Sequence, residues 1–405
     1  MSLLSELIFN KIENNKKLGL YRKIPEIAYE DFNLKTCQDK NTNGRFINYS
    51  TATANLATND YLGFAKNKKI KKATKKAIDV YGTSASSSFL IYGHSEIHLA
   101  LEKELCDFKG GYEKSLLYPS GYQANTGIIK SLSSILPLKT FIAFDELSHA
   151  SIIDGVLASG VKFKSFKHND LNCLENILDK HKNYEIKLVI TEGVFSMDGD
   201  VPDLPGILNI AKLHGALSIV DDAHATGTIG EKGGGSADFH KVKPDIIIGT
   251  LGKALASNGA FAVSSSLIIE YLINFSRTFI FSTGIPPSSA ASALEALKLI
   301  KDNPKIVKKL QDYSKFARDY LKKSGLNTLN STTHIIPIFI GEEDKAVSVE
   351  KELLKMGIYL KAVRYPTVQR KNARLRLGVN AKLKKETLKK ALKDIAHNVK
   401  FYSCV

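Results

Sequence analysis

Two apolar runs in the second half of the chain end abruptly in polar side chains, and this pattern constrains the fold most. Residues 246–248 are followed by Gly249-Thr250 and then by Lys253, whereas residues 217–220 lead directly into Asp221-Asp222-Ala223-His224. Short apolar runs bounded in this way are typical of buried strands in an α/β sheet. Because such sheets present their chemistry at the carboxyl ends of the strands, the polar residues are predicted to lie at one sheet edge.

The residue types at this predicted edge indicate a particular chemistry. A lysine just beyond a strand can form a Schiff base with an aldehyde cofactor. A carboxylate on the neighbouring strand, here Asp221, can pair with a buried cationic ring nitrogen. Lys253, Asp221 and His224 together predict a pyridoxal phosphate site. The alternative is that Lys253 is an ordinary surface lysine, which is common after a strand.

Composition restricts the partners of the chain. Its 405 residues are 43% hydrophobic, enough for a large core, and 57 basic against 41 acidic residues give a net charge of +16. The densest basic runs, 65–76 and 382–393, have the spacing of amphipathic helices with solvated faces. No zinc-finger spacing or aromatic-interleaved basic strip accompanies them. We therefore expect no nucleic-acid partner, and an acidic substrate such as a coenzyme A thioester fits the charge equally well.

The cysteines and the apolar stretches bear on compartment. The four cysteines, at 37, 106, 173 and 404, form no CxxC pair and no metal spacing with histidine. This predicts a reduced, cytoplasmic protein without a metal site. Residues 1–17 have the pattern of an amphipathic helix, not of a signal peptide. No apolar stretch reaches the ~20 residues of a membrane helix, so no membrane span is expected.

Three segments are expected along the chain. Residues 1–50 are predicted to form a helix and an extended stretch, and residues 51–285 a large α/β domain with a mostly parallel sheet. Its candidate strands are 140–144, 188–191, 217–220, 246–248 and 260–263. Residues 286–405 are predicted to form a small α+β domain that begins with long helices. Its candidate strands are 335–340, 358–363 and 375–379, followed by a helix from about residue 384.

Other residues at predicted strand or helix ends are candidates for the site. Ser120-Gly121 opens a helix, where free backbone N–H groups can bind an anion or merely form an N-cap. His149 follows a strand, so its ring can stack on a flat cofactor or hydrogen-bond at the surface. Glu192 and Ser196 follow another strand. The glycine-rich stretch 227–235 lacks a dinucleotide-binding context and is predicted to be a flexible loop.

Arginine supplies an independent signal, because only eight basic positions are Arg in a chain that otherwise uses Lys. Arg374 and Arg376 alternate on a predicted strand, so both point to one face. A guanidinium group binds a carboxylate through two parallel hydrogen bonds, which Lys cannot do. The pair is therefore a candidate carboxylate clamp, or else two solvent-facing charges on an edge strand.

Nine strings in order carry a resemblance to a known family. They are NDYLG (59–63), SGYQAN (120–125), SHASIIDG (148–155), HND (168–170), EGVFSMDGD (192–200), VDDAH (220–224), GTLGKA (249–254), FIFSTGIPP (279–287) and ARLRL (373–377). From about residue 45 to 380 the chain resembles the α-oxoamine synthases. These are fold-type I pyridoxal phosphate enzymes with a seven-stranded-type sheet, and they join an amino acid to an acyl-CoA with loss of CO2.

The resemblance implies a role for each matching residue. Lys253 would hold the cofactor and then remove the Cα proton, Asp221 would pair with the pyridine nitrogen, and His149 would stack on the ring. His224 and Ser196 would bind the ring hydroxyl. The phosphate would be held by Gly121, Tyr122 and Thr250, and across a homodimer interface by Ser282 and Thr283 of the other subunit. The substrate carboxylate would be bound by Arg376, with Asn59 and Arg22 as further substrate contacts.

Within the family, the chain is most similar to members that use L-alanine and a pimeloyl thioester, on CoA or a carrier protein, in biotin biosynthesis. Sibling enzymes use glycine, serine or a longer acyl-CoA. The sequence departs from the family pattern at Phe89, where many members have an arginine, and this difference bears on the choice of substrate. An aminotransferase and a non-catalytic homologue are the alternatives from other classes. An aminotransferase would share Lys253 and Asp221 but not the SHAS and VDDAH strings together. The intact Lys253, Asp221, His149 and His224 argue against a non-catalytic role.

Overall fold

The computed structural model describes residues 2–18, 20–21, 24, 27–28, 47–48 and 54–404. The chain divides into two compact units. The larger unit contains Thr58–Pro337 and Leu377–Lys385, and the smaller contains Met1–Ala57, Ile338–Arg376 and Glu386–Val405. The domain limits expected near residues 50 and 285 stay predictions.

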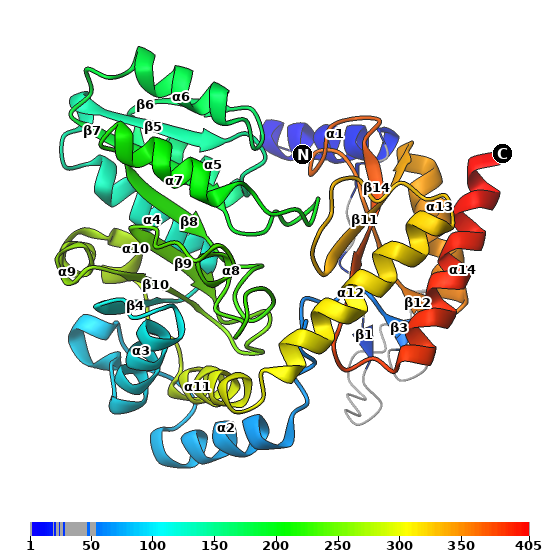
Figure 1. Ribbon diagram of the computed structural model, residues 1–405, viewed down its shortest axis with the longest axis horizontal. Coiled ribbons are helices and arrows are strands. Elements are labelled where there is room, and N and C mark those ends of the chain that lie inside the picture. Colours follow the sequence, from blue (N-terminus) through cyan, green and yellow to red (C-terminus); the bar gives the residue numbers. More distant parts are fainter. Residues whose placement is uncertain are drawn as a thin grey trace. The chain divides into compact units, whose positions relative to one another are not determined.

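A seven-stranded sheet forms the centre of the larger unit (Figure 1). In spatial order its strands are β4 (Lys114–Tyr118), β10 (Ala260–Ser264), β9 (Ile246–Thr250), β8 (Leu217–Asp221), β7 (Ile186–Glu192), β5 (Thr140–Asp145) and β6 (Lys162–Phe166). From β9 to β6 all neighbours are parallel, whereas β10 runs antiparallel to both β9 and β4. The predicted mostly parallel α/β fold is therefore confirmed.

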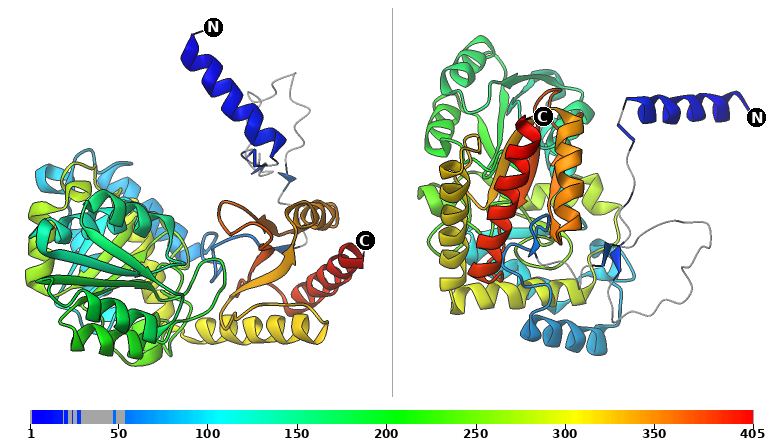
Figure 2. Two further views of the ribbon diagram at one scale, coloured as in Figure 1. Left: turned by 90° about the horizontal axis from the view of Figure 1, so that it is seen from above. Right: turned by 90° about the vertical axis from the view of Figure 1, so that its right-hand side faces the viewer.

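Helices cover both faces of this sheet, as Figures 1 and 2 show. Alternate residues of β5 reach opposite faces, because successive side chains of a strand point to opposite sides. Ile142 and Phe144 pack with α4 (Gly121–Ser133), α5 (Ala150–Ser159) and α9 (Ser266–Phe275). Phe141 and Ala143 pack with α6 (Leu171–Lys180) and α7 (Leu204–Leu213). Each fully buried Ile, Leu or Phe contributes roughly 1.5–3 kcal/mol, so these two clusters hold the sheet between its helices.

Further helices complete the larger unit. They are α2 (Lys68–Tyr81), the π-helix η1 (Phe89–Gly93), α3 (Glu96–Phe108), the 3-10 helix η2 (Pro137–Lys139), α8 (Ser236–His240), α10 (Arg277–Ile280), α11 (Pro287–Asp302) and α12 (Lys305–Lys323). The basic run at 65–76 lies mostly in α2, which buries Ile70 and Ala77 and is capped by Asn67. Its lysines are solvated, as expected for an amphipathic helix.

In its described residues, the smaller unit contains short strands and three helices. Its elements include α1 (Leu3–Lys17), β1 (Ile27–Ala28), β2 (Ile47–Asn48), β3 (Ala54–Asn55), α13 (Glu343–Lys355), β12 (Ile358–Tyr359), β13 (Lys361–Val363) and most of α14 (Lys385–Cys404). A three-stranded sheet has the order β11 (Ile335–Gly341), β14 (Ala373–Gly378), β13. The single strand predicted at 358–363 is wrong, because β12 pairs with β3 and β13 pairs with β14. Within the described residues, no helix is long and apolar enough to cross a membrane.

A buried ion pair fixes the turn that follows β8. The Lys109 ammonium lies 2.5 Å from Asp222, and both side chains are fully buried. Lys109 also donates to the Thr226 hydroxyl and to the Gly234 carbonyl, both at 2.8 Å. The other Asp222 oxygen accepts the Ser236 hydroxyl at 2.6 Å. The pair therefore joins the end of α3 to the turn after β8 and to the glycine-rich stretch.

The glycine-rich stretch 227–235 is an internal turn and not the loose loop that its composition suggests. The Gly227 N–H donates to the Gly233 carbonyl at 2.7 Å, and the Gly235 N–H donates to the Ile229 carbonyl at 3.1 Å. Most of its residues are buried. The glycines allow this close packing, since a Cβ on Gly235 would lie 1.8 Å from an Asp222 carboxylate oxygen.

We predict that Lys109→Met lowers the free energy of unfolding by about 3–5 kcal/mol, because it leaves the Asp222 carboxylate buried without its cation. Urea unfolding followed by circular dichroism measures this loss. The matched control is Lys139→Met, which removes an exposed pair with Glu185 and is expected to cost less than about 1 kcal/mol. Similar losses in the two variants would contradict a structural role for the buried pair.

Candidate active site

The predicted site residues gather where four parallel strands end. The last residues of β5, β7, β8 and β9 are Asp145, Glu192, Asp221 and Thr250. These strands are neighbours in the sheet and run in one direction, so their carboxyl ends meet at one edge. Lys253 follows three residues after β9. The sheet edge predicted from the two apolar runs is therefore present, with side chains from two further strands beside it.

Asp221 presents an oriented carboxylate at this edge. It is only 7% exposed, and one oxygen accepts the backbone N–H of Ala223 at 2.9 Å. The other oxygen accepts a hydrogen from the Asn125 side-chain amide at 2.7 Å, and Asn125 also donates to Ser151 at 2.8 Å. Both partners are neutral, so the negative charge of Asp221 remains available to a cationic group.

Lys253 and His224 are in direct contact. The Lys253 amine lies 2.9 Å from Nε2 of His224, and Nδ1 of the same ring lies 2.8 Å from the Tyr61 hydroxyl. Tyr61 in turn donates to Oδ1 of Asn59 at 2.9 Å. His224 and Tyr61 are buried, and Lys253 is half-buried. The sequence-predicted residues Lys253, His224 and Asn59 are thus joined through Tyr61, to which sequence analysis assigned no role.

His149 is the N-cap of α5, directly after the turn that follows β5. Its Nδ1 lies 2.8 Å from the Ser151 hydroxyl, and its backbone N–H donates to Glu192 at 2.5 Å. Burial lowers the pKa of His149, the charge of Asp221 opposes this shift, and the charge of Lys253 adds to it. The ring is therefore neutral at neutral pH, as suits a residue that stacks on a cofactor.

Glu192 is a buried acid beside Asp221, and the two residues are partners in the register of β7 and β8. Burial raises the pKa of Glu192 well above its usual range, and the negative charge of Asp221 raises it further. Glu192 therefore keeps its proton to a higher pH than an ordinary glutamate does.

The start of α4 and the end of β9 form a place for an anion. A Cβ on Gly121 would lie 2.6 Å from the Thr250 methyl group, so only glycine fits there. The Thr250 hydroxyl is buried and has no hydrogen-bond partner among the residues that the structure describes. Ser120 caps the helix by accepting the Gln123 N–H at 3.2 Å, and the N–H groups of Gly121 and Tyr122 have no partner among the described backbone contacts. A hydroxyl donor and a helix N-terminus together suit a phosphate group.

The remaining predicted phosphate contacts differ in their surroundings. Tyr122 is exposed, and its hydroxyl donates to Asp154. Ser282 accepts a hydrogen bond from the Gln123 side chain of the same chain at 3.0 Å, and Thr283 forms an isolated antiparallel bridge with Ser88. Ser282 thus lies beside the N-terminus of α4 in its own chain.

His168 connects two loops at this sheet edge. Sequence analysis noted it only within the HND string. Its Nδ1 lies 3.0 Å from Asp145, and its Nε2 lies 2.7 Å from Asp200. Burial by itself lowers the pKa of His168, but the hydrogen bonds and charges of the two aspartates outweigh burial and raise the pKa to about 10. The imidazolium therefore holds the turn 195–200, which carries Ser196, against the end of β5.

The predicted carboxylate clamp lies on β14, in the smaller unit. Arg374 and Arg376 are 7% and 8% exposed, and β14 is the middle strand of its sheet. This burial excludes a solvent-facing pair on an edge strand. Arg22, the other predicted arginine contact, lies outside the described residues.

Phe89 packs into an aromatic cluster. Its ring contacts His98 edge-on, with ring centroids 5.0 Å apart, and lies 6.0 Å from the ring of Phe279. A Cβ on Gly284 would meet the Phe89 ring at 2.3 Å. Phe89 therefore occupies apolar space beside the Ser282-Thr283 segment, and its surroundings suit an aromatic ring better than a charged guanidinium.

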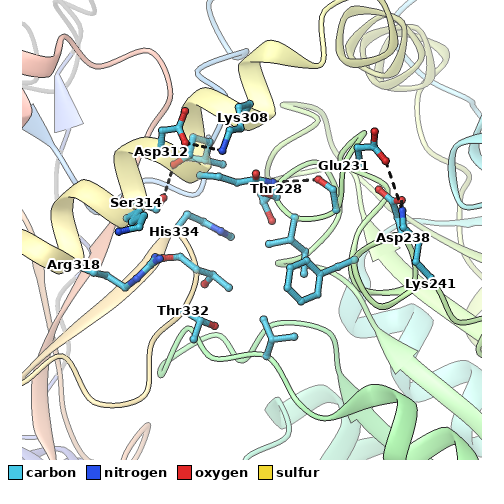
Figure 3. Close-up of a pocket in the computed structure, with 18 residues that line it drawn as sticks. Thr228, Glu231, Asp238, Lys241, Lys308, Asp312, Ser314, Arg318, Thr332 and His334 are labelled. Carbon is cyan, nitrogen blue, oxygen red and sulfur yellow. Dashed lines mark hydrogen bonds and ion pairs between the residues drawn. The ribbon is translucent and has the colours of Figure 1, made fainter.

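A cavity of about 480 Å³ lies elsewhere in the larger unit (Figure 3). Helix α12 carries Lys308 and Asp312 on one side, with Glu231 and Asp238 on the other. Lys308 and Asp312 form an ion pair at 2.9 Å. Lys253 does not line this cavity, so we place the candidate active site at the sheet edge on chemical grounds.

The chain is similar to known proteins over most of its length. Residues 51–395 match the family model of aminotransferase class I and II. The chain is 38% identical over 398 residues to 8-amino-7-oxononanoate synthase of Thermoanaerobacter pseudethanolicus, and the match covers 97% of each protein. The chain therefore belongs to the aminotransferase class I and II family and, within it, to the α-oxoamine synthases.

Solved structures show the same fold. The structure of 8-amino-7-oxononanoate synthase from Francisella tularensis is 28% identical with a TM-score of 0.73, and the match covers 86% of this chain and 98% of that one. A serine palmitoyltransferase with pyridoxal phosphate as an internal aldimine is 26% identical with a TM-score of 0.81, covering 87% of this chain and 88% of that one.

We predict that His168 makes stability depend on pH. Its folded pKa of about 10 exceeds the ordinary value of 6.5, so its contribution is complete below pH 6.5 and is lost as the pH rises through about 10. Urea unfolding of the wild type and of His168→Gln across this range measures the effect. The difference in unfolding free energy is expected to be largest near pH 6.5 and to shrink towards pH 10. A difference independent of pH would show that His168 is not held as a cation.

Proposed function

We propose that the protein is a pyridoxal phosphate-dependent enzyme that condenses an amino acid with an acyl thioester and releases CO2. The observation that carries the proposal is the contact of Lys253 with His224 beside the buried carboxylate of Asp221. These groups lie at the ends of neighbouring strands. Similarity to 8-amino-7-oxononanoate synthases over nearly the whole chain supports this reaction class.

The chain's residues fit pyridoxal phosphate at both ends of that molecule. The buried Thr250 hydroxyl, which has no partner among the described residues, and the N–H groups of Gly121 and Tyr122 suit the phosphate. The Tyr122 hydroxyl is bound to Asp154, so we assign the phosphate contact to the Tyr122 backbone N–H. Asp221 suits a cationic ring nitrogen, because its carboxylate is buried and bonded only to neutral donors in the described contacts. When bound, the cofactor supplies an electron sink for negative charge at the Cα of the amino acid.

The protein side chains then carry the proton transfers. Lys253 would hold the cofactor, and its amine would accept the Cα proton of the bound amino acid. His224 lies 2.9 Å from that amine, and the ring of His149 would stack on the cofactor. His224 and Ser196 would bind the ring hydroxyl.

We propose L-alanine and a pimeloyl thioester, on CoA or a carrier protein, as substrates in biotin biosynthesis. The names of the similar synthases support this choice. Glycine, serine or a longer acyl-CoA are the alternatives, and Phe89 bears on them because it replaces an arginine common in the family. The net charge of +16 suits an acidic thioester. Arg376 binds the carboxylate of the amino acid, with Asn59 and Arg22 as additional contacts.

The proposed assembly is a homodimer in the cytoplasm. Exposed apolar side chains gather next to the Ser282-Thr283 segment: Leu90, Ile91, Tyr92 and Phe281 are 51%, 82%, 81% and 69% exposed. A second copy of the chain would cover this surface and bring its own Ser282 and Thr283 to the neighbouring phosphate.

We predict that Lys253→Ala abolishes both cofactor attachment and turnover. The purified wild type with pyridoxal phosphate should absorb visible light. Treatment with borohydride should attach the cofactor covalently, which increases the mass of the protein. The wild-type enzyme should also release CoA from pimeloyl-CoA in the presence of L-alanine. Lys253→Ala should do neither, whereas Lys139→Ala, an exposed lysine, should match the wild type.

Two results would contradict the proposal. Borohydride-fixed cofactor at normal stoichiometry in Lys253→Ala would place the attachment on another lysine. Transfer of the amino group to a keto acid without CoA release from any acyl-CoA would make the enzyme an aminotransferase.

We predict that Arg376→Ala raises the dissociation constant of L-alanine at least tenfold, about 1.4 kcal/mol, because a bidentate carboxylate contact is lost. Titration of the cofactor absorbance with L-alanine measures it. Arg374→Ala is the matched control, since both arginines are buried on β14, and its effect should be much smaller. The reverse order would assign the clamp to Arg374, and equal small effects would remove it from this strand.

A further inference from the structure

A buried row of hydrogen-bonding side chains leads to Lys253 from the segment before α2. The Tyr61 hydroxyl lies 2.9 Å from Oδ1 of Asn59 and 2.8 Å from Nδ1 of His224. On the opposite side of the imidazole, Nε2 lies 2.9 Å from the Lys253 amine. Tyr61 is fully buried and His224 is 6% exposed. The positions of the protons in this row therefore depend on the protein groups themselves.

The protons can be assigned from the chemistry of each group. A phenol has one O–H, and Tyr61 donates it to the amide oxygen of Asn59. Towards His224 the phenol oxygen can then only accept, so Nδ1 of His224 must carry a hydrogen. In a neutral imidazole the other nitrogen is then an acceptor. That acceptor, Nε2, faces the amine of Lys253, which has hydrogens to donate.

The position of Tyr61 is set on several sides. Its backbone carbonyl accepts the Ala381 N–H at 2.8 Å, and its backbone N–H donates to the Asn59 carbonyl at 2.9 Å. The edge of the His334 ring packs against it with centroids 4.0 Å apart. The hydroxyl is therefore held between Asn59 and His224, and turning its O–H towards His224 would give up the hydrogen bond to Asn59.

We propose that Tyr61 is a positioning residue that fixes His224 in the tautomer with its proton on Nδ1, so that Nε2 is a permanent acceptor next to Lys253. The consequence for catalysis rests on the proposed function of Lys253. As an acceptor, Nε2 holds the Lys253 amine through a hydrogen bond that the amine donates. The opposite tautomer would direct an N–H of His224 at the nitrogen that must take up the Cα proton, and would compete for its lone pair.

The test is the protonation state of the two His224 nitrogens, measured by 15N NMR on protein with 15N-labelled histidine side chains. Spectra are recorded with and without pyridoxal phosphate, and His224→Gln identifies the resonances. In the wild type, Nδ1 should be protonated and Nε2 unprotonated. Tyr61→Phe removes the acceptor, and the ratio of the Nδ1–H to the Nε2–H tautomer should fall about threefold to tenfold, or about 0.7–1.4 kcal/mol.

Asn59 offers a sharper pair of variants. Asn59→Asp keeps an acceptor for the Tyr61 hydroxyl and should preserve the Nδ1–H tautomer. Asn59→Leu removes that acceptor, so the Tyr61 proton should turn to His224 and drive the proton of the ring to Nε2. Tyr118→Phe is the control for loss of a buried phenol, since Tyr118 bonds to Ser276 and has no described contact with His224.

Two outcomes would overturn the proposal: a protonated Nε2 in the wild type, or the same tautomer ratio in Tyr61→Phe as in the wild type. The cofactor-free spectra separate this test from the proposed function. If the protein failed to bind pyridoxal phosphate, the tautomer of His224 would still be measured, whereas the role assigned to Lys253 would fail.

Discussion

The active site proposed here depends on one constraint, the common direction of four neighbouring strands in the sheet. Because β5, β7, β8 and β9 are parallel, residues far apart in the chain end at one edge. Asp145 and Thr250 are the last residues of the outer two of these strands. No local interaction could bring such distant residues together. The apolar packing of helices on both faces of the sheet therefore also positions the side chains of the proposed active site.

Gathering acids at a buried edge has a cost in free energy, because each carboxylate loses its hydration. The protein meets this cost in different ways. Asp222 is paired with a buried lysine, Asp145 shares the imidazolium of His168, and burial raises the pKa of Glu192 well above its usual range. Asp221 accepts hydrogen bonds from neutral donors in its described contacts. These different surroundings explain how several acids lie close together while one of them, Asp221, can pair with a cationic cofactor ring.

The fold could be predicted from the sequence where the local pattern is strong. Long apolar runs identified β5, β7, β8, β9 and β10, because strands buried on both faces are apolar throughout. The same reasoning did not single out β6, whose Lys162 and Lys164 interrupt the pattern at an exposed sheet edge. It also predicted one strand where the structure has β12 and β13. The sequence pattern of a strand does not show which neighbouring strand it pairs with, and here β12 pairs with β3 whereas β13 pairs with β14.

At the site, the sequence by itself determined which reactive groups are present and that strand ends carry them: Lys253, Asp221 and His224 stand directly after apolar runs. Only the tertiary structure decided their partners. Lys109 reaches Asp222 across 113 residues, and Tyr61 reaches His224 across 163. Such contacts leave no periodicity in the sequence, since they arise from packing between elements and not from spacing within one. The charge and proton position of each group depend on those contacts, and so were decided by the fold.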